Sequence, residues 1–167
     1  MRPAAALLAL AVATAAIPAA AQPPPADKTQ AAIDRWLGQY VERGDYGLLE
    51  VADGRARYFH VVTVQDMTGP VIRGWLRNEY FDPPSAARAY RSMDPLFDFD
   101  CVNLRVRPLA YDAYAQLNRR GAVVDSADLQ SPRWTYARSS QPLELALNQA
   151  CEARAKAIAA AGAERRR

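Results

Sequence analysis

The stretch DCVNLRV, residues 100–106, carries the strongest clue to the architecture, because its Cys101 is one of only two cysteines in the chain. Its alternation of apolar and polar side chains predicts a β-strand over Asp100–Arg107. The second cysteine, Cys151, lies on the apolar face of a predicted C-terminal helix. We expect a disulfide between Cys101 and Cys151 that tethers this helix to a sheet. Closing a loop of about 50 residues is worth roughly 4 kcal/mol in the chain-entropy description.

One detail of this strand leaves two arrangements open. Cys101 has the parity of Asn103 and Arg105, not that of the apolar residues Val102 and Val106. Either a bulge or bend near Cys101 reverses the parity, or the helix crosses only the Cys101 end of the polar face.

The N-terminus has the three parts of an export signal. Arg2 supplies the positive charge, residues 4–16 are apolar, and Ala19-Ala20-Ala21 offers a cleavage site before Gln22. We predict a signal peptide over residues 1–21, a proline-rich spacer over 22–27, a single domain over 28–161 and a basic disordered tail over 162–167. The apolar segment is too short for a transmembrane anchor, and no cysteine follows the cleavage site to carry a lipid. We therefore expect a periplasmic or secreted protein.

The net charge of +3 comes from the ends of the chain. Without Arg2 and the three arginines at 165–167, 17 basic side chains stand against 18 acidic ones, a net charge of −1. A domain that grips nucleic acid usually carries a basic stripe, so we expect no nucleic-acid partner.

The pattern of the remaining chain predicts strands between two helices. An amphipathic helix is expected over Lys28–Arg43, with Asp27 as its cap and Gly44 in the left-handed position that ends helices. A second helix is expected from Ser139-Ser140 through Cys151 to about Ala161. The segments with strand character are Tyr46–Ala52, Arg57–Gln65, Val71–Tyr80, Asp100–Arg107, Leu109–Leu117, Ala122–Ser126 and Arg133–Ala137.

Turn signals separate these strands. Asp53-Gly54 is a strong hairpin signal, and the cluster at residues 66–70 is a second turn. We expect Ser85–Met93 to be a short helix or an ordered loop that ends at Asp94-Pro95. The sequence therefore predicts an α+β fold: an antiparallel sheet of about six strands, an N-terminal amphipathic helix, and a C-terminal helix tethered to the sheet by a disulfide.

The reactive side chains form no visible catalytic constellation. His60 is the only histidine, and we interpret it as a structural residue of an apolar strand. No nucleophile-elbow, Walker or Rossmann pattern is present, and Asp98 and Asp100 have no visible partner that would separate their pKa values. We therefore expect no enzyme, no catalytic residues, no metal and no cofactor.

Arg73, Trp75 and Arg77 are the candidate binding residues. They occupy alternate positions of one predicted strand. If exposed, they form a basic-aromatic ladder, and arginine and tryptophan are enriched at binding hot spots. The alternative is that Trp75 lies in the core and the two arginines flank it.

Several features from Asp100 onward occur in an order and spacing similar to those of a known family. They are Asp100-Cys101, Arg105, Arg107, the segment from Tyr111 to Ser126, Trp134, Ser139-Ser140 and Cys151. In these features the chain resembles the surface-adhesin protein E family of exported bacterial proteins, with a looser similarity back to about Tyr46. The resemblance implies an antiparallel sheet with a C-terminal helix tethered by a disulfide.

The name-giving members of that family are outer-membrane lipoproteins that bind host extracellular-matrix proteins. This chain departs from them in lacking a lipidation cysteine and in adding an N-terminal helix. We expect a non-enzymatic cell-envelope binding module that recognises a protein or an envelope polymer through a sheet face. The alternative is a small periplasmic enzyme or enzyme inhibitor. An exposed aromatic-basic face favours the first, and a deep pocket with a desolvated carboxylate favours the second.

Overall fold

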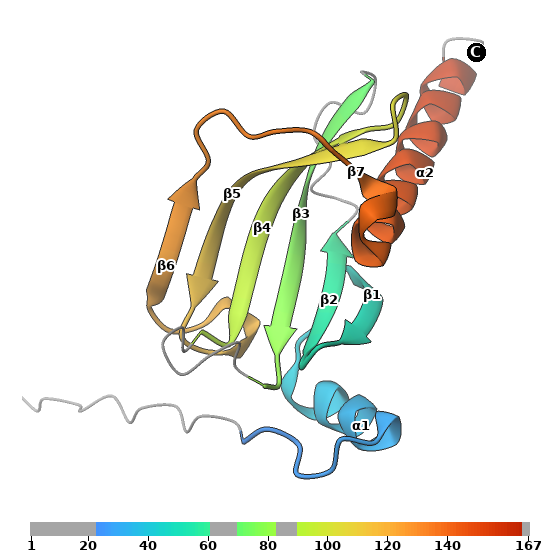
Figure 1. Cartoon of the computed structure of the whole chain (residues 1–167). Coiled ribbons are helices and arrows are strands. Elements are labelled where there is room, and N and C mark those ends of the chain that lie inside the picture. Colours follow the sequence, from blue (N-terminus) through green and yellow to red (C-terminus); the bar gives the residue numbers. More distant parts are fainter. Residues whose placement is uncertain (1–22, 61–69, 83–89, 165–167) are drawn as a thin grey trace, which may run out of the picture.

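A curled antiparallel sheet of seven strands forms the body of the protein, with a helix packed against each of its faces (Figure 1). The computed structural model describes residues 23–60, 70–82 and 90–164. The strands are β1 Tyr46–Ala52, β2 Arg55–His60, β3 Val71–Tyr80, β4 Ser92–Asp100, β5 Arg105–Tyr114, β6 Val123–Asp128 and β7 Thr135–Tyr136. The helices are α1 Gln30–Tyr40 and α2 Gln141–Glu164, with the short 3-10 turns η2 Leu117–Arg119 and η3 Ala137–Ser139. The predicted α+β architecture is confirmed.

Neighbouring strands follow one another along the chain, in the order β1 to β6, and β7 pairs with the first residues of β5, beside the end of β6. Short turns allow this meander, since antiparallel neighbours need no long crossover. The predicted signal peptide, most of the turn predicted at residues 66–70 and the last residues of the strand predicted to end at Gln65 lie outside the described residues.

The β1–β2 hairpin confirms the turn predicted at Asp53-Gly54. Both residues have positive φ, 51° and 74°, as the two-residue turn that matches strand twist requires. Ala52 pairs with Arg55, so β2 starts two residues earlier than the predicted Arg57.

The strand predicted over Asp100–Arg107 is wrong. Asp100 ends β4, residues 101–104 form a turn, and β5 begins at Arg105. Val102 is 68% exposed, so the apparent apolar alternation has no structural meaning there. Cys101 lies in this turn, so the alternation of side chains along a strand does not apply to it. Neither a bulge within a strand nor a helix crossing one end of a strand's polar face is needed to explain its position.

β4 was not predicted, because Asp94-Pro95 reads as a terminator. Ser92 and Met93, expected in a helix or loop, open this strand, while residues 85–89 of that segment lie outside the described residues. Pro95 lies where the β3–β4 pairing is interrupted, between Leu96 and Met93, and next to the β4–β5 register shift between Leu96 and Phe97. Its missing N–H donor therefore falls in an irregular part of the sheet. Pro108 of β5 lies opposite Phe97 at the same irregularity, and bulges are where a strand tolerates missing N–H donors.

The larger core lies between α2 and one face of the sheet. Side chains of β2 to β5 pack there against Ala146, Leu147 and Ala150 of α2. Cys101 and Cys151 lie at the rim of this core and form the predicted disulfide, with their Cα atoms 5.6 Å apart. The tether between the C-terminal helix and the sheet is confirmed.

The smaller core lies between α1 and the opposite face of the sheet. Trp36 and Leu37 pack there with Tyr58 of β2 and Leu117 of η2. The buried residues of α1, Ile33, Trp36 and Leu37, recur at the i, i+3 and i+4 spacing of one helical face, as expected of the predicted amphipathic helix.

Several boundaries of the helices differ from the prediction. Thr29, not Asp27, is the N-cap, and its hydroxyl accepts a hydrogen bond from the Ala32 amide. Gly44 has a φ of 54°, but it lies in the turn to β1, after α1 has ended at Tyr40. At the other end, α2 continues to Glu164, beyond the expected end near Ala161. No described helix is both long and apolar enough to cross a membrane.

Candidate functional site: the polar face of the sheet

The sheet face opposite α2 carries charged and aromatic side chains from its central strands, and we call it the polar face. The strand registers place the following residues on it: Arg73, Trp75, Arg77 and Glu79 of β3, Asp94, Leu96, Asp98 and Asp100 of β4, and Arg105, Arg107, Asp112 and Tyr114 of β5. α1 covers the β1–β2 side of this face at one end. The part that extends from β3 to β5 is the candidate site.

One end of the polar face holds three arginines around two buried carboxylates, with a tryptophan beside them. Arg73 Nε lies 2.9 Å from Asp98 Oδ1, and Arg107 Nη2 lies 2.8 Å from Asp98 Oδ2. Arg105 Nε donates to Asp100 Oδ2 at 2.9 Å. We call this group, Arg73, Arg105, Arg107, Asp98, Asp100 and Trp134, the arginine platform.

Trp134 stacks on two guanidinium groups of the arginine platform. The centre of its ring lies 4.8 Å from the Arg105 guanidinium carbon and 4.6 Å from that of Arg107. Trp134 directly precedes β7, whose Thr135 pairs with Val106 of β5. The platform thus combines one aromatic ring with the two cationic groups that stack on it.

The two carboxylates of the arginine platform stay ionised. Burial acts to raise the pKa of Asp98, but hydrogen bonds from Arg73 and Arg107 outweigh it and lower the pKa. For Asp100, burial is likewise outweighed by hydrogen bonds from Asn103, Arg105 and the Val102 amide, and the pKa falls to about 2. The arginine side chains are 33–46% exposed while their carboxylate partners are 2–4% exposed. The platform therefore presents cations to solvent and hides the anions that orient them.

Arg77 is buried, so Arg73, Trp75 and Arg77 do not form the exposed ladder that was one of the two arrangements considered for them. The Arg77 side chain is only 4% exposed and pairs with Glu79. It also donates to the Glu42 carbonyl and to Asn118 Oδ1, each at 2.8 Å. Arg73 is exposed, as expected for a ladder, and Trp75 is half-buried.

Asn118 explains why Arg77 is buried. The side-chain nitrogen of Asn118 donates to the Tyr40 carbonyl at the end of α1, and its side-chain oxygen accepts from the backbone N–H of Glu42. The backbone N–H of Asn118 donates to the Glu79 carboxylate. Burial raises the pKa of Glu79 to about 7, against the opposing effect of Arg77 and the Asn118 amide. This network joins α1, β3 and η2 and is structural.

A cavity of about 280 Å³ opens beside Trp75, and we call it the Trp75 cavity. Its lining residues are Tyr46, Trp75, Asp94, Asp112, Tyr114 and Arg119. A neighbouring cavity of about 300 Å³ includes His60, Arg77 and Asn118 in its lining. The His60 ring lies 4.4 Å from the Tyr46 ring, which is consistent with the structural role predicted for it.

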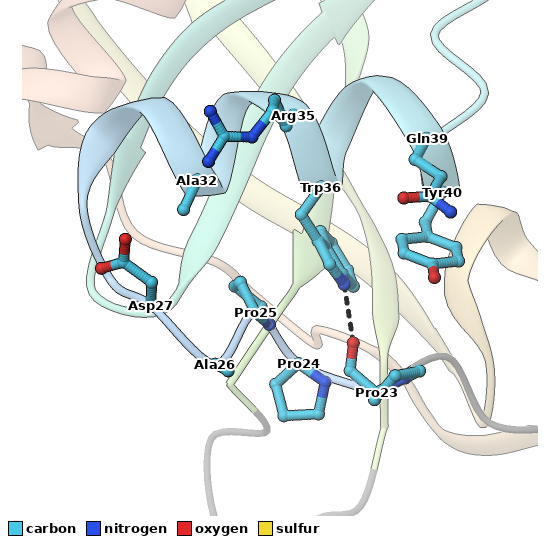
Figure 2. A pocket seen from close by; sticks show the side chains of 10 residues that line it. All are labelled: Pro23, Pro24, Pro25, Ala26, Asp27, Ala32, Arg35, Trp36, Gln39 and Tyr40. Atoms are coloured by element: carbon cyan, nitrogen blue, oxygen red, sulfur yellow. Dashed lines mark hydrogen bonds between the residues drawn. The ribbon is translucent and has the colours of Figure 1, made fainter.

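A third cavity, of about 310 Å³, lies between α1 and residues 23–27 (Figure 2). The Trp36 indole N–H donates to the Pro23 carbonyl at 2.6 Å, and Pro25 is buried. The prolines predicted to form a spacer therefore fold back onto α1. Within the described residues no cluster of three or more histidine, cysteine or acidic side chains could hold a metal.

The sequence reasoning missed Asp94 and Asp112 and gave Trp134 no binding role. A signal for Asp94 was present: residues 92–100 alternate Ser, Asp, Leu, Asp, Asp against Met, Pro, Phe, Phe, a period of two that indicates a strand with one polar face. No comparable signal marks Trp134, because its contact with β5 depends on the path of the chain after β6.

The sequence profile of the surface-adhesin protein E family matches residues 48–152, the span from β1 to the second cysteine. Two solved structures of Haemophilus influenzae protein E are similar at low identity. One, its crystal form II, is 15% identical with a TM-score of 0.49, covering 66% of this chain and 90% of that one. The other, from a non-typeable strain, is 14% identical with a TM-score of 0.40, covering 57% and 67%. No curated protein sequence matches significantly. On the profile match, which spans well over half of its residues, the chain belongs to the surface-adhesin protein E family.

Proposed function

We propose that the protein is an exported, non-enzymatic binding protein of the bacterial cell envelope, and that it recognises a protein or an envelope polymer through the polar face of its sheet. Membership of a surface-adhesin family supports a binding role. The choice of surface rests on the arginine platform. Its three arginine side chains are partly exposed, and two of them, Arg105 and Arg107, stack on Trp134.

The arginine platform suits recognition for two reasons. Arginine and tryptophan are the residue types most enriched at binding hot spots. The buried carboxylates of Asp98 and Asp100 hold the arginines in place before any ligand arrives, so less side-chain entropy is lost on binding.

The test is an affinity pull-down from envelope extract with the mature protein, followed by titration of the captured ligand. Trp134→Ala and Arg73→Ala should each weaken binding, Trp134→Ala by about 2 kcal/mol or more as expected for a hot spot. Arg35→Ala is the matched control, because Arg35 is an exposed arginine that lies outside the polar face, on α1 at the cavity between α1 and residues 23–27 (Figure 2). If the control loses as much affinity as the platform variants, or if the platform variants lose none, the arginine platform is not the binding surface.

Export makes a separate prediction. Protein purified from the periplasm or the medium should begin at Gln22, as the Ala19-Ala20-Ala21 cleavage site requires, and should contain no thiol that labels under native conditions. Intact-mass analysis and thiol labelling measure both properties. Retained signal sequence in the purified protein would contradict export by this route.

One observation favours the alternative of an envelope enzyme or inhibitor. Asp94 lines the Trp75 cavity, and burial raises its pKa to about 6, a feature common at catalytic sites. However, no serine, cysteine or histidine lies among the described lining residues of this cavity. Turnover of purified peptidoglycan fragments that is lost in Asp94→Asn would establish the alternative.

A further inference from the structure

The Trp75 cavity has walls of two kinds, aromatic and acidic. Tyr46 of β1, Trp75 of β3 and Tyr114 of β5 supply the rings, and Asp94 of β4 and Asp112 of β5 supply the carboxylates. Asp94 and Asp112 lie directly opposite each other in the β4–β5 register. Like charges at facing positions destabilise a sheet, so a positive charge near Asp94 and Asp112 would stabilise the pair.

Asp94 is the unusual member of this cavity. Its side chain is 9% exposed, and its Oδ1 atom is buried without a hydrogen-bond partner among the described residues. Its Oδ2 atom has one cationic neighbour, Arg119 Nη1, at 3.4 Å. Charge-assisted hydrogen bonds are usually about 2.7–2.9 Å long, so Arg119 satisfies this carboxylate poorly. An unsatisfied buried acceptor is costly, and a ligand donor would remove that cost.

The lining of the cavity carries more acidic than basic groups. Two carboxylates, those of Asp94 and Asp112, face one lining guanidinium, that of Arg119, whose side chain is 45% exposed. The Arg77 guanidinium carbon lies 5.3 Å from the centre of the Tyr46 ring, but Arg77 is paired with Glu79. Burial, followed by the charge of Asp94, raises the pKa of both Tyr46 and Tyr114. The hydroxyl groups of these tyrosines therefore stay protonated and can donate or accept hydrogen bonds.

A cation with an apolar stem matches this combination. Aromatic faces attract a cation and carboxylates neutralise it. The volume of about 280 Å³ lies just below the usual range for drug-sized ligands, about 300–1,000 Å³, so a single side chain fits better than a larger substrate. An ammonium group can distribute three donors between separate acceptors, whereas a guanidinium prefers one bidentate carboxylate. Here the acceptors are separate: Asp94, Asp112 and the tyrosine hydroxyls.

We propose that the Trp75 cavity receives the ammonium group of a lysine side chain on the protein that the polar face binds. This inference deepens the proposed function and rests on it. Arg119 holds the place of that ammonium in the unbound protein, where it lies 3.4 Å from both Asp94 Oδ2 and the Tyr46 hydroxyl. Lysine binding displaces it, so Arg119 competes with the ligand.

The first experiment needs no variant. Nα-acetyl-lysine amide is titrated into isotope-labelled mature protein at pH 7.5 and followed by NMR, with Nα-acetyl-norleucine amide as the uncharged control. The lysine probe should shift the signals of the Trp75 indole and of Tyr46 and Tyr114 in a saturable way, and the norleucine probe should not. Equal shifts from both probes, or none at the cavity, overturn the proposal. Tighter binding of Nα-acetyl-arginine amide overturns the assignment to lysine.

Variants then test the residues. Asp94→Asn and Asp112→Asn should each weaken binding of the lysine probe about tenfold or more, and Arg119→Gln should strengthen it. Asp125→Asn is the matched control, because Asp125 is half-buried on the neighbouring strand β6 and accepts from Tyr111. Unchanged affinity in both Asp94→Asn and Asp112→Asn overturns the proposal, and native dispersion of the NMR spectra verifies each fold.

Failure of this proposal and failure of the proposed function remain distinguishable. If a captured ligand depends on the arginine platform but binds Asp94→Asn as well as the parent, the lysine cavity is wrong and the binding function stands. If the lysine probe binds but no envelope or host component depends on the polar face, the cavity is a cation site and the proposed function is wrong.

Discussion

At the scale of single residues, Arg77 and Arg73 lie on the same face of the same strand but differ about tenfold in exposure. The Arg77 side chain is 4% exposed and the Arg73 side chain 46%. Arg77 neutralises the fully buried carboxylate of Glu79. Arg73 shares Asp98 with Arg107, so that carboxylate keeps a partner when Arg73 is removed.

We predict that Arg77→Ala lowers the free energy of unfolding by about 3–5 kcal/mol, the scale for removing one partner of a buried ion pair. Arg73→Ala should cost under about 1 kcal/mol, as exposed pairs do. Urea denaturation at pH 7 measures both. Similar losses in the two variants would contradict the structural role assigned to Arg77.

A second prediction concerns the pH dependence of stability. Burial raises the pKa of Asp94 to about 6 in the folded protein, above its ordinary value of about 3.9. The folded state therefore binds this proton more tightly than the unfolded state, and stability rises as the pH falls through 6. Relative to Asp94→Asn, the parent should gain about 1 kcal/mol between pH 7 and pH 5.

Denaturation of both proteins at the two pH values measures this gain. Asp98 and Asp100 have lowered pKa values and therefore do not titrate within the window. The pKa of Glu79 is raised to about 7, chiefly by burial and in part by the charge of Asp94, so both proteins are compared in a Glu79→Gln background. A parent that loses stability relative to Asp94→Asn on acidification would rule out the assigned direction.

At the scale of elements, α2 is held to the sheet in two ways. Its small apolar residues pack on the face opposite the polar face, and the disulfide fixes Cys151 to the β4–β5 turn. The hydrogen bonds that Asp100 accepts from Val102 and Asn103 shape that turn, so the tether is attached to an ordered point.

We predict that replacing Cys101 and Cys151 together with serine lowers stability by about 4 kcal/mol, the chain-entropy value for the separation of 50 residues. The last turns of α2 should lose hydrogen-exchange protection first, since described contacts of α2 with the core concentrate between Leu143 and Ala153. Protection of α2 equal to that in the parent would contradict the tethering role.

At the scale of the whole molecule, residues 23–27 precede α1 and fold back against it, so they are part of the fold (Figure 2). The bond from Trp36 to the Pro23 carbonyl and the burial of Pro25 attach this segment. A chain that begins at Ala26 should therefore lose about 1 kcal/mol of stability, the usual net value of one hydrogen bond. Trp36, only 6% exposed in the intact fold, should show red-shifted fluorescence.

Trp36→Phe in the same truncated chain is the control for that prediction, because it removes the fluorophore in question and leaves Trp75 and Trp134 in place. A red shift that persists in the control would mean that the change arises elsewhere. Unchanged stability after truncation would show that the proline segment contributes nothing to the fold.

Much of the fold was predictable because its signals are local. Asp53-Gly54 specifies a hairpin through the positive φ that both residues adopt, and the apolar spacing of α1 identifies Trp36 and Leu37 as core. β4 was not predictable in the same way. Proline is normally excluded from a central strand, and Pro95 is accepted in β4 where the β3–β4 pairing is interrupted, beside a register shift between β4 and β5.

The candidate site was predictable only in its residue types. The alternation of arginine and tryptophan on β3 drew attention to this strand, yet the exposed arginine platform takes Arg105 and Arg107 from β5 and Trp134 from the segment before β7. No local pattern relates Trp134 to β5. The contact exists because the chain returns across the sheet after β6.

The sequence alone determines the α+β class, the helix before and the helix after the strands, and the pairing of the two cysteines. Hydrophobic period, turn chemistry and cysteine number are properties of the chain itself. The tertiary structure alone settles which of three alternating side chains on β3 meets solvent. Burial depends on what packs above a strand, and the cover over Arg77 is Asn118, 41 residues later in the chain. For the same reason the facing of Asp94 and Asp112, and the cavity between them, emerge only when β4 and β5 pair.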